Sequence, residues 1–512
     1  DVGLGKTFVA ILLARLRRQQ GTAKRPFVVV PKSVATNWSE EVEALFPGSK
    51  VLVIGEHINS KGKAVTDTAQ QRNRKLAQMK QNDYDLIICT KPAFERIPLK
   101  KETTDKYESE DFYYQRAGSI DDATGSSTKD TADKKIEKLK ASWAQDKLQA
   151  KFGHEESLVF WEDLGVDMLM ADEAHAYKNL YAAKQRFGKS PKFLGASGQA
   201  LIARKMQHMA RVVRDDANGG VFFLTATPTK NSPVEVFNML QHIAPEEFSS
   251  RGIVNSEQFI DRYCQMEQRL VLAPPGGKKK KKKKDDGDDD ALFGDDFEGA
   301  GNLVEALCVT GFQNLKELEV IMDKYMLLQT ATDVGLKIPD ANEKLELIDM
   351  TDEQRGVYNT LRAQAAKLDP RKDPGGQFRI MDRMKKAAQD LELYDPVIYA
   401  GWGKNSPKYK AAVESVYEGA TTRGGQIVFV DHKASHQRLK EMLIEKGMKP
   451  DEIGIINGTV AKDSATRQAI GDKFNLGTIK VVIGTTGTMG EGVNLQGKHN
   501  TPKGRVKKRL ER

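Results

Sequence analysis

The sequence predicts an α/β fold of two lobes, each a parallel sheet with helices on both faces. Short apolar runs of strand length alternate with helical segments over residues 1–243, and the alternation restarts near residue 405. A charged and partly low-complexity stretch separates the two halves. Polar and glycine-rich motifs follow the ends of several apolar runs, which is where open α/β sheets bind their ligands.

The chain opens on DVGLGKT, which is the end of a phosphate-binding loop. Gly3 and Gly5 let backbone amides cradle phosphates. Lys6 reaches the β- and γ-phosphates, and the Thr7 hydroxyl binds Mg²⁺. An apolar helix over residues 8–15 places the phosphate on its N-terminus. The alternative is a glycine turn before an ordinary helix.

An acidic motif lies at residues 166–179, which read VDMLMADEAHAYKN. An apolar run that ends in the carboxylates Asp172 and Glu173 is typical of a buried parallel strand, so both are expected at its C-terminal edge. Asp172 suits holding Mg²⁺ through oxygen, and Glu173 is placed to orient or deprotonate a water. The alternative is a strand end followed by an acidic helical turn. The phosphate-binding loop favours the metal site.

Apolar periodicity predicts the rest of the first half. Strands are expected over residues 25–30, 50–54, 85–90 and 221–224, and helices over 39–45, 70–80, 199–214 and 234–243. We interpret the methionines of the 199–214 helix as core residues. Residues 100–151 are interpreted as an inserted, mostly helical excursion, partly disordered around 118–133.

Polar residues follow two of these strands. Lys32 and Asn37 come after the first, in a loop that can meet a phosphate backbone. The alternative is a polar loop beside a half-buried Trp38. Thr225 and Thr227 come after the strand at 221–224 and can bond the acidic pair and sense the γ-phosphate. The alternative there is a capped loop before the next helix.

The middle of the chain is predicted to join the halves, with the boundary across residues 342–404. Residues 274–300 are low complexity, a lysine run followed by aspartates, and are expected to be a solvated linker or surface loop. The alternative is a DNA-binding tail. A strand is expected over residues 343–349. A helix follows over 351–368, with a capping box formed by its first and fourth residues.

The second half repeats the α/β pattern. Strands are expected over residues 426–430, 452–456 and 481–484, and helices over 435–446 and 465–474. The loop at 485–496 holds three glycines and three threonines, so it can approach a phosphate closely and bend between states. The alternative is a glycine-rich turn.

Composition bounds the class of protein. A chain of 512 residues is long enough for two or three domains, and a net charge of +9 permits nucleic-acid binding without showing it. Cys89, Cys264 and Cys308 lie far apart without a metal or disulfide pattern, which suits a reducing cytosol. We find no membrane-spanning apolar run and no signal peptide. Because the chain opens inside a motif, we expect a fragment of a larger protein.

Taken in order, these motifs resemble a superfamily-two helicase motor, most similar to the Swi/Snf-type DNA translocases. The matching segments are GLGKT at 3–7, VVVPKSVATNW at 28–38, DLIICT at 85–90, DEAHAYKN at 172–179, LTATPTKNSPVEVFNML at 224–240, IVFVDHK at 427–433 and TTGTMGEGVNLQ at 485–496. The residues around the DEAH box at 172–175 also resemble those of phage- or plasmid-borne helicase–methyltransferase (antirestriction-like) proteins. This resemblance implies a methyltransferase module outside this chain on the same polypeptide. It also implies that the protein works in the cytoplasm of a bacterial or phage-infected cell.

The resemblance implies two RecA-like P-loop NTPase lobes that bind ATP and Mg²⁺ between them and move on duplex DNA. Lobe one is residues 1–243, the helical and linker region is 244–404, and a truncated lobe two is 405–512. The resemblance assigns catalysis to Lys6, Asp172 and Glu173, nucleotide binding to Gly3, Gly5, Lys6, Thr7, Gly490 and Glu491, and the metal to Thr7 and Asp172. It assigns coupling to His175, Thr225, Thr227 and Asn494, and sequence-independent grip on nucleic acid to Lys32, Asn37, Thr90, Lys433 and Thr485.

The sequence departs from the family pattern at both ends. The segment with an adenine-reading glutamine is absent, and motif VI, which in the family supplies an arginine to the γ-phosphate, is not recognisable. An arginine finger is worth about 10³–10⁵ in rate, so this chain alone is expected to bind ATP poorly and hydrolyse it slowly. The alternatives are an RNA helicase or restriction-type motor subunit, and a catalytically decayed nucleic-acid clamp.

Overall fold

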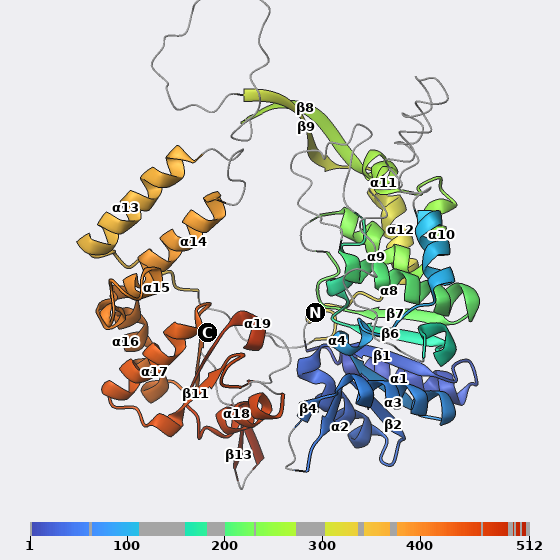
Figure 1. Cartoon of the computed structure of the whole chain (residues 1–512), viewed down its shortest axis with the longest axis horizontal. Coiled ribbons are helices and arrows are strands. Elements are labelled where there is room, and N and C mark those ends of the chain that lie inside the picture. The colour runs from blue at the N-terminus through green and yellow to red at the C-terminus, as the bar shows by residue number, and fades with distance from the viewer. Residues whose placement is uncertain are drawn as a thin grey trace, which may run out of the picture. The chain divides into compact units, whose positions relative to one another are not determined.

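The computed structural model describes residues 3–60, 64–111, 159–181, 200–229, 232–272, 303–335, 343–368, 376–461, 464–489, 495, 498–501 and 504–507. The chain divides into two compact units (Figure 1). The first comprises Asp1–Arg269 and Ala306–Ile338, and the second comprises Leu270–Glu305 and Pro339–Arg512. Within the described residues, no helix is long and apolar enough to cross a membrane.

A five-stranded parallel sheet forms the centre of the first unit, lobe one. Its strands are β1 (Pro26–Val30), β2 (Val51–Ile54), β5 (Leu86–Thr90), β6 (Met168–Asp172) and β7 (Gly220–Leu224), in the order β2-β5-β1-β6-β7. Every neighbouring pair is parallel. The apolar runs of the sequence therefore form the strands that they predict, and the strands' carboxyl ends share one edge of the sheet.

Helices cover both faces of this sheet, which is why its strands are continuous apolar runs. α1 (Lys6–Gln19) and α2 (Ala35–Leu45) pack on the face that carries Val28, Val30, Met168 and Met170. α3 (Ala69–Gln81), α8 (Leu201–Arg211) and α9 (Val234–Ile243) pack on the face that carries Phe27, Val29, Leu169 and Ala171. Alternate residues of β1 and β6 thus point to opposite cores.

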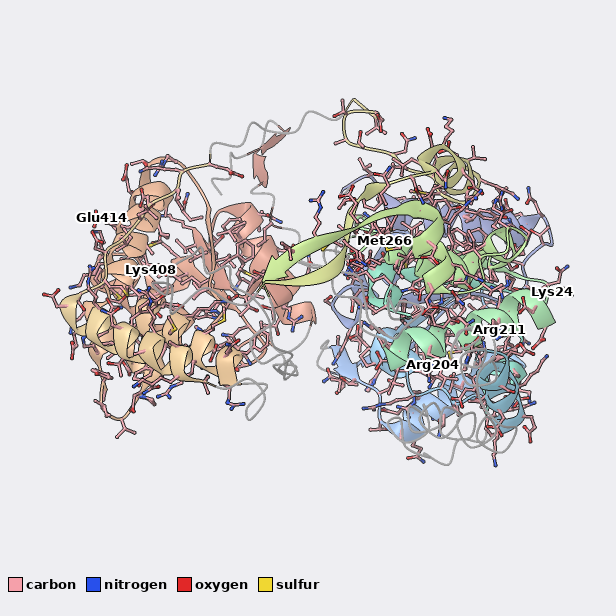
Figure 2. The ribbon with its side chains drawn as sticks, turned by 90° about the horizontal axis from the view of Figure 1, so that it is seen from above. Lys24, Arg204, Arg211, Met266, Lys408 and Glu414 are labelled. Carbon is pink, nitrogen blue, oxygen red and sulfur yellow. The ribbon has the colours of Figure 1, made fainter. Side chains whose placement is uncertain are left out.

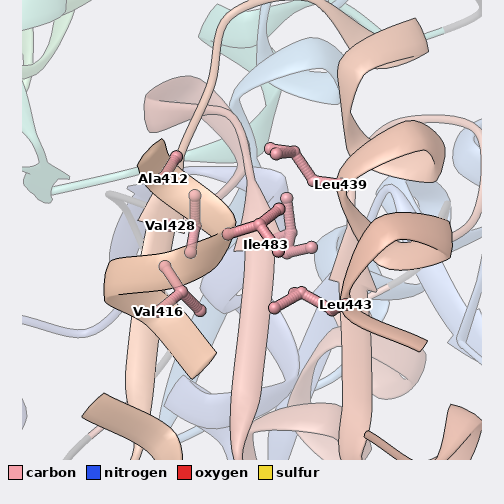
Figure 3. Close-up of a pocket in the computed structure, with 7 residues that line it drawn as sticks. Ala412, Val416, Val428, Leu439, Leu443 and Ile483 are labelled. Atoms are coloured by element: carbon pink, nitrogen blue, oxygen red, sulfur yellow. The ribbon is translucent and has the colours of Figure 1, made fainter. Parts of the chain in front are cut away.

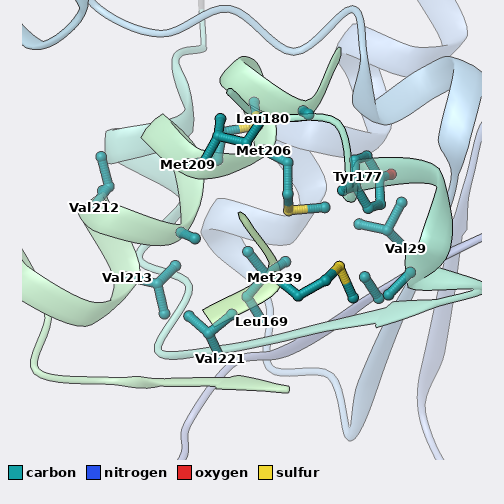
Figure 4. Close-up of a cluster of buried hydrophobic side chains, with 14 of the residues drawn as sticks. Val29, Leu169, Tyr177, Leu180, Met206, Met209, Val212, Val213, Val221 and Met239 are labelled. Atoms are coloured by element: carbon teal, nitrogen blue, oxygen red, sulfur yellow. The ribbon is translucent and has the colours of Figure 1, made fainter. Parts of the chain in front are cut away.

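Methionines contribute to the second of these cores. Figure 4 shows Met206 and Met209 of α8 beside Leu169 and Val221 of the sheet. Both methionines are fully buried, so their interpretation as core residues is confirmed. Burying a side chain of this size stabilises the fold by about 1.5–3 kcal/mol.

Lobe one continues beyond the boundary expected at residue 243. α10 (Glu246–Ser249), α11 (Ser256–Tyr263) and α12 (Leu315–Tyr325) all belong to the first unit. Aromatic packing explains the difference, because the ring centroid of Phe237 on α9 lies 5.3 Å from that of Phe248 and 5.5 Å from that of Phe259. These helices complete a core that α9 leaves open.

Charged contacts dock the start of the predicted insertion on α8. Residues 101–111 are helical, and the rest of the insertion lies outside the described residues, as does the low-complexity stretch. The Arg211 guanidinium lies 3.9 Å from the Tyr107 ring centroid, and Arg211 also pairs with Asp111 at 3.5 Å. Figure 2 labels Arg211 and Arg204 on this helix.

Smaller elements complete the described chain before α13. Two-stranded sheets pair β3 (Glu56–Ile58) with β4 (Ala64–Thr66) and β8 (Cys264–Leu272) with β9 (Leu303–Phe312). The short helices are η1 (Lys32–Val34), α4 (Lys91–Phe94), η2 (Trp161–Leu164), η3 (Ala174–Tyr177) and the π-helical η4 (Val212–Asp216).

The second unit contains a helical hairpin of α13 (Asp352–Lys367) and α14 (Gly376–Gln389). The predicted capping box at the start of α13 is confirmed, because Thr351 and Gln354 each accept a hydrogen bond from the other's backbone N–H. The Gln354 side chain also donates to the Ala387 carbonyl at 2.9 Å. One residue therefore caps α13 and ties it to α14.

The strand expected over residues 343–349 is wrong. This stretch has no regular structure, and Leu345 and Leu347 are 85% and 86% exposed. An alternating pattern becomes a strand only where a neighbouring strand pairs with it, and none of the described strands does so.

A three-stranded parallel sheet forms the centre of lobe two. Its strands are β10 (Gln426–Phe429), β11 (Ile453–Ile456) and β12 (Val481–Gly484), in the order β10-β12-β11. α16 (Pro407–Thr422) and α17 (Lys433–Glu445) pack on one face, and α18 (Ser464–Leu476) packs on the other. The remaining elements are α15 (Leu391–Tyr394), η5 (Trp402–Asn405), η6 (Pro450–Glu452), α19 (Thr486–Met489), β13 (Lys498–Thr501) and β14 (Gly504–Lys507).

A small apolar cavity lies between α16, α17 and this sheet (Figure 3). Its lining consists of Ala412, Val413, Val416, Val428, Leu439, Leu443 and Ile483. At about 10 Å³ it is far too small for a nucleotide, and its aliphatic lining offers water no side-chain hydrogen-bond partner. The cavity is therefore a packing defect and not a ligand site.

Candidate nucleotide-binding site

The N-terminus of α1 has the backbone of an anion-binding site. Gly3 and Gly5 have φ angles of 79° and 75°, in the left-handed region that favours glycine. No side chain caps the helix at Gly5, and its first turn carries no acidic residue. The amide groups of that turn, together with the helix dipole, favour a bound anion. Lys6 and Thr7 are the first two residues of this helix.

Ion pairs fix which end of α1 lies at which edge of the sheet. Arg15 pairs with Asp85 at 3.1 Å, and Arg18 pairs with Asp83 at 3.0 Å. Both aspartates lie just before β5, so the C-terminal half of α1 is held at the amino edge of the sheet. A helix of this length spans about 21 Å, comparable to a five-residue strand of about 17 Å. Lys6 and Thr7 therefore lie at the carboxyl edge, where β6 ends.

The acidic pair at the end of β6 has an unusual backbone. Asp172 is the last residue of the strand, and its Oδ1 accepts a hydrogen bond from the Glu173 N–H at 2.9 Å. Glu173 has a φ of 50°, whereas the other described non-glycine residues with positive φ are asparagines. A glutamate in the left-handed region costs about 1–3 kcal/mol and is typical of functional sites.

His175 joins the acidic pair to the neighbouring strand. Its Nδ1 lies 3.1 Å from Glu173 Oε2 and 3.3 Å from Thr225 Oγ1. The register of β6 and β7 pairs Asp172 with Leu224, so Thr225 comes abreast of Glu173. Thr225 Oγ1 also accepts a hydrogen bond from the Thr227 N–H at 3.1 Å. The structure thus brings together the coupling residues expected in lobe one.

A tryptophan holds the other oxygen of Asp172. Trp38 Nε1 of α2 donates to Asp172 Oδ2 at 3.0 Å, and its side chain is 1% exposed. Glu41, one turn further along α2, has its pKa raised by burial and then by the Asp172 charge. Sequence reasoning gave Trp38 no functional role. The signal was its position directly after Asn37, at the end of the helicase-like segment VVVPKSVATNW at residues 28–38.

Sequence reasoning also missed a polar face of α9 that holds the chain after the DEAH box. Asn238 Nδ2 donates to the carbonyls of Lys178 and Tyr181 at 2.9 and 3.1 Å, and its Oδ1 accepts from the Tyr181 N–H at 3.2 Å. Glu235 is fully buried and pairs with Lys178 at 3.1 Å. His242 Nε2 lies 3.1 Å from the Tyr177 carbonyl. The spacing of these three α9 residues at helical intervals was the available signal.

The donor set at this edge fits a magnesium–nucleotide complex. The described residues contain no group of three or more His, Cys, Asp or Glu that could alone hold a metal. Mg²⁺ is usually bound through one or two carboxylates and by substrate phosphates, so Asp172 with the Thr7 hydroxyl is the expected protein share. Lys6 and the α1 N-terminus supply the positive charge that phosphates need.

The residues predicted to contact nucleic acid lie in different settings. Lys32 on η1 hydrogen-bonds Thr66, and Asn37 is part-exposed on α2. Lys433 is exposed at the start of α17. Thr90 is 2% exposed, packed so closely that a Cβ on Gly55 would lie 2.1 Å from its hydroxyl. Its side chain is therefore not presented to a ligand in this structure.

The predicted site residues of lobe two are only partly described. Thr485 follows β12, and its hydroxyl lies 2.8 Å from that of Thr488. Gly490, Glu491 and Asn494 lie outside the described residues. Their assigned roles stay predictions.

Comparison with known proteins defines the family. Residues 1–270 match a family described as a probable helicase domain, and residues 207–393 match the SNF2-related domain. The first match covers more than half of the chain. The chain therefore belongs to this helicase family.

Among curated proteins, the chain is similar to the "Defense against restriction protein B" of Escherichia phage P1. The two are 28% identical over 400 residues, which cover 71% of this chain and 16% of the phage protein. The chain thus spans about a sixth of the length of this relative.

Three solved structures are loosely similar. The Sulfolobus solfataricus SWI2/SNF2 ATPase core in complex with dsDNA is 16% identical with a TM-score of 0.33, covering 95% of this chain and 72% of that one. The Sulfolobus solfataricus SWI2/SNF2 ATPase core domain is 14% identical with a TM-score of 0.30, and the match covers 95% of this chain and 70% of that one. The Pyrococcus furiosus Hef helicase domain is 15% identical with a TM-score of 0.32, and the match covers 96% of this chain and 83% of that one.

Proposed function

We propose that the chain is the motor of an ATP-dependent DNA translocase, which couples ATP hydrolysis to movement on duplex DNA. The observation that carries this proposal is the meeting of the α1 N-terminus with Asp172 and Glu173 at one edge of the sheet. Membership of the helicase family and the match of residues 207–393 to the SNF2-related domain support it. A methyltransferase module on the same polypeptide stays a prediction.

In this proposal, lobe one binds the phosphates and positions the water. Lys6 and the amides of the first turn of α1 bind phosphate oxygens, and Thr7 and Asp172 would hold Mg²⁺. When bound there, the ion would supply positive charge that offsets the charge developing on the phosphate oxygens. Glu173 orients the attacking water through its carboxylate.

His175 makes the orientation of Glu173 depend on β7. Because the imidazole touches both the Glu173 carboxylate and the Thr225 hydroxyl, a shift of the segment after β7 alters the contact that holds the carboxylate. Lys32 and Asn37 lie on the segment that follows β1, at the same edge of the sheet, and contact the nucleic-acid backbone. Such contacts fix position without reading sequence, as a moving motor requires.

The test is ATP hydrolysis by the full-length protein with duplex DNA, single-stranded DNA or RNA. We expect duplex DNA to stimulate turnover most. Stimulation by RNA alone would identify an RNA helicase. Binding of duplex DNA without any ATP turnover would leave a nucleic-acid clamp and overturn the proposal.

A further inference from the structure

The Asp172 carboxylate is held from two sides by N–H donors. Trp38 Nε1 donates to Oδ2 at 3.0 Å, and the Glu173 amide donates to Oδ1 at 2.9 Å. Two donors on two oxygens fix both the position of a carboxylate and the plane in which it lies. The partners that hold a metal ligand in this way typically govern its affinity for the metal.

Trp38 is rigidly placed for this task. It is 1% exposed in the core that also contains Val30, Val42 and Met170. An indole N–H can only donate, so Asp172 Oδ2 is the acceptor in this contact and its direction is fixed. The contact joins residues 134 positions apart in the sequence, and it therefore exists only in the folded lobe.

The same short segment also carries the predicted nucleic-acid contacts. Trp38 follows Asn37 directly on α2, and Lys32 lies on the adjoining η1. Thr36 of the same segment donates to Glu56 at 2.8 Å, which ties it to the β3–β4 hairpin. A phosphate backbone that contacts Asn37 thus contacts the helix that holds the Asp172 carboxylate, and one that contacts Lys32 contacts the short helix that leads directly into it.

We propose that Trp38 is a positioning residue that orients Asp172 for Mg²⁺ and transmits nucleic-acid binding on residues 32–37 to the metal site. This proposal rests on the nucleotide site proposed above. It adds a link within lobe one between the DNA-contacting segment and the metal ligand, separate from the link through His175.

The test compares Trp38→Phe with Trp161→Phe. Both tryptophans are 1% exposed and donate one indole hydrogen bond, since Trp161 Nε1 donates to the Met209 carbonyl at 3.1 Å. Trp161 lies in the core on the opposite face of the sheet. Phenylalanine keeps an aromatic ring in each site and removes the N–H. Any difference between the variants therefore reports the Asp172 bond and not the loss of a buried indole.

The readout is binding of a fluorescent ADP analogue by the full-length protein, titrated with MgCl₂ and repeated with saturating duplex DNA. We expect Trp38→Phe to weaken the Mg²⁺-dependent part of binding by about 10-fold or more, with metal-free binding unchanged. The stimulation of ATP turnover by DNA should also fall in Trp38→Phe. Trp161→Phe should keep both properties.

Mg²⁺ affinity in Trp38→Phe within twofold of the unsubstituted protein, or an equal loss in Trp161→Phe, would overturn the role of Trp38. Absence of Mg²⁺-dependent binding in the unsubstituted protein would instead contradict the proposed function. If Trp38→Phe does not fold, indole ¹⁵N NMR of the unsubstituted protein decides. We expect adding MgCl₂ to the ADP complex to shift one indole signal far more than that of Trp161, and no such shift overturns the proposal.

Discussion

The segments that follow β6 in lobe one and β12 in lobe two both leave buried parallel strands, but different contacts hold them in place. At β6, the acidic pair is contacted by Trp38 from α2, by His175 from η3 and, through it, by Thr225 after β7. At β12, the described loop is held by a bond between its own threonines and by Thr488 Oγ1, which donates to the Ile456 carbonyl at 3.0 Å.

The difference indicates how each lobe positions its motif. In lobe one, several elements that are distant in sequence fix the geometry before any ligand arrives. In the described part of lobe two, a hydrogen bond within the loop and one to the neighbouring strand β11 hold the motif. Substitutions around β6 should therefore act through tertiary neighbours, whereas single charge contacts in lobe two should matter less.

The largest effect on stability should come from breaking the buried ion pair between Glu235 of α9 and Lys178. Glu235→Ala removes the carboxylate that pairs with the buried Lys178, and we expect a loss of about 3–5 kcal/mol in the free energy of unfolding. The matched change in lobe two is Glu414→Ala, which removes an exposed partner of Lys446 and should cost at most about 1 kcal/mol. Urea unfolding measures both.

The double variant Lys178→Met with Glu235→Leu is the control for this comparison. Replacing both charges by apolar groups should recover most of the stability. Equal losses from Glu235→Ala and Glu414→Ala would break the contrast between the lobes.

Acid should weaken lobe one before lobe two. Burial lowers the pKa of His242 from 6.5 to about 4, so the unfolded chain binds more protons between these values. The stability that neutral His242 provides is complete above pH 6.5 and falls by on the order of 3 kcal/mol as pH drops to 4. In lobe two, the hydrogen bond from Arg438 lowers the pKa of Glu392 from 4.5 to about 2, so that contribution is lost only below pH 4.5.

Hydrogen exchange followed by mass spectrometry at pH 7 and at pH 5 resolves the two lobes. Peptides of α9 and β7 should lose protection relative to those of α16 and α17. His242→Gln removes the titrating group and should remove most of this difference. If His242→Gln loses as much hydrogen-exchange protection at pH 5 as the unsubstituted protein, other groups cause the acid sensitivity.

The sequence predicts the strands well because both sheets are covered on both faces and their strands are almost wholly apolar. It also predicts that Asp172, Glu173 and Thr225 lie together, since motifs after parallel strands share an edge. Contacts that depend on how a helix is rotated about its own axis cannot be predicted from the sequence pattern. The bond from Trp38 to Asp172 joins residues 134 positions apart, and no periodicity reveals which way an indole points.

Two misjudged segments have the same origin in non-local packing. Residues 343–349 alternate like a strand, but a strand also needs a partner, and pairing cannot be inferred from one segment. The boundary expected at residue 243 missed α10 and α11 because their aromatic residues pack on Phe237. Local pattern identifies elements, whereas packing between distant elements decides where a lobe ends.

The central claim is that Glu173 activates water at the carboxyl edge of the lobe-one sheet. It is tested most directly by DNA-stimulated ATP hydrolysis in Glu173→Gln, beside the exposed control Glu319→Gln on α12. We expect Glu173→Gln to bind Mg²⁺–ATP normally and to lose about 10²–10⁴-fold in turnover, while Glu319→Gln keeps its rate. Full turnover in Glu173→Gln would contradict the account.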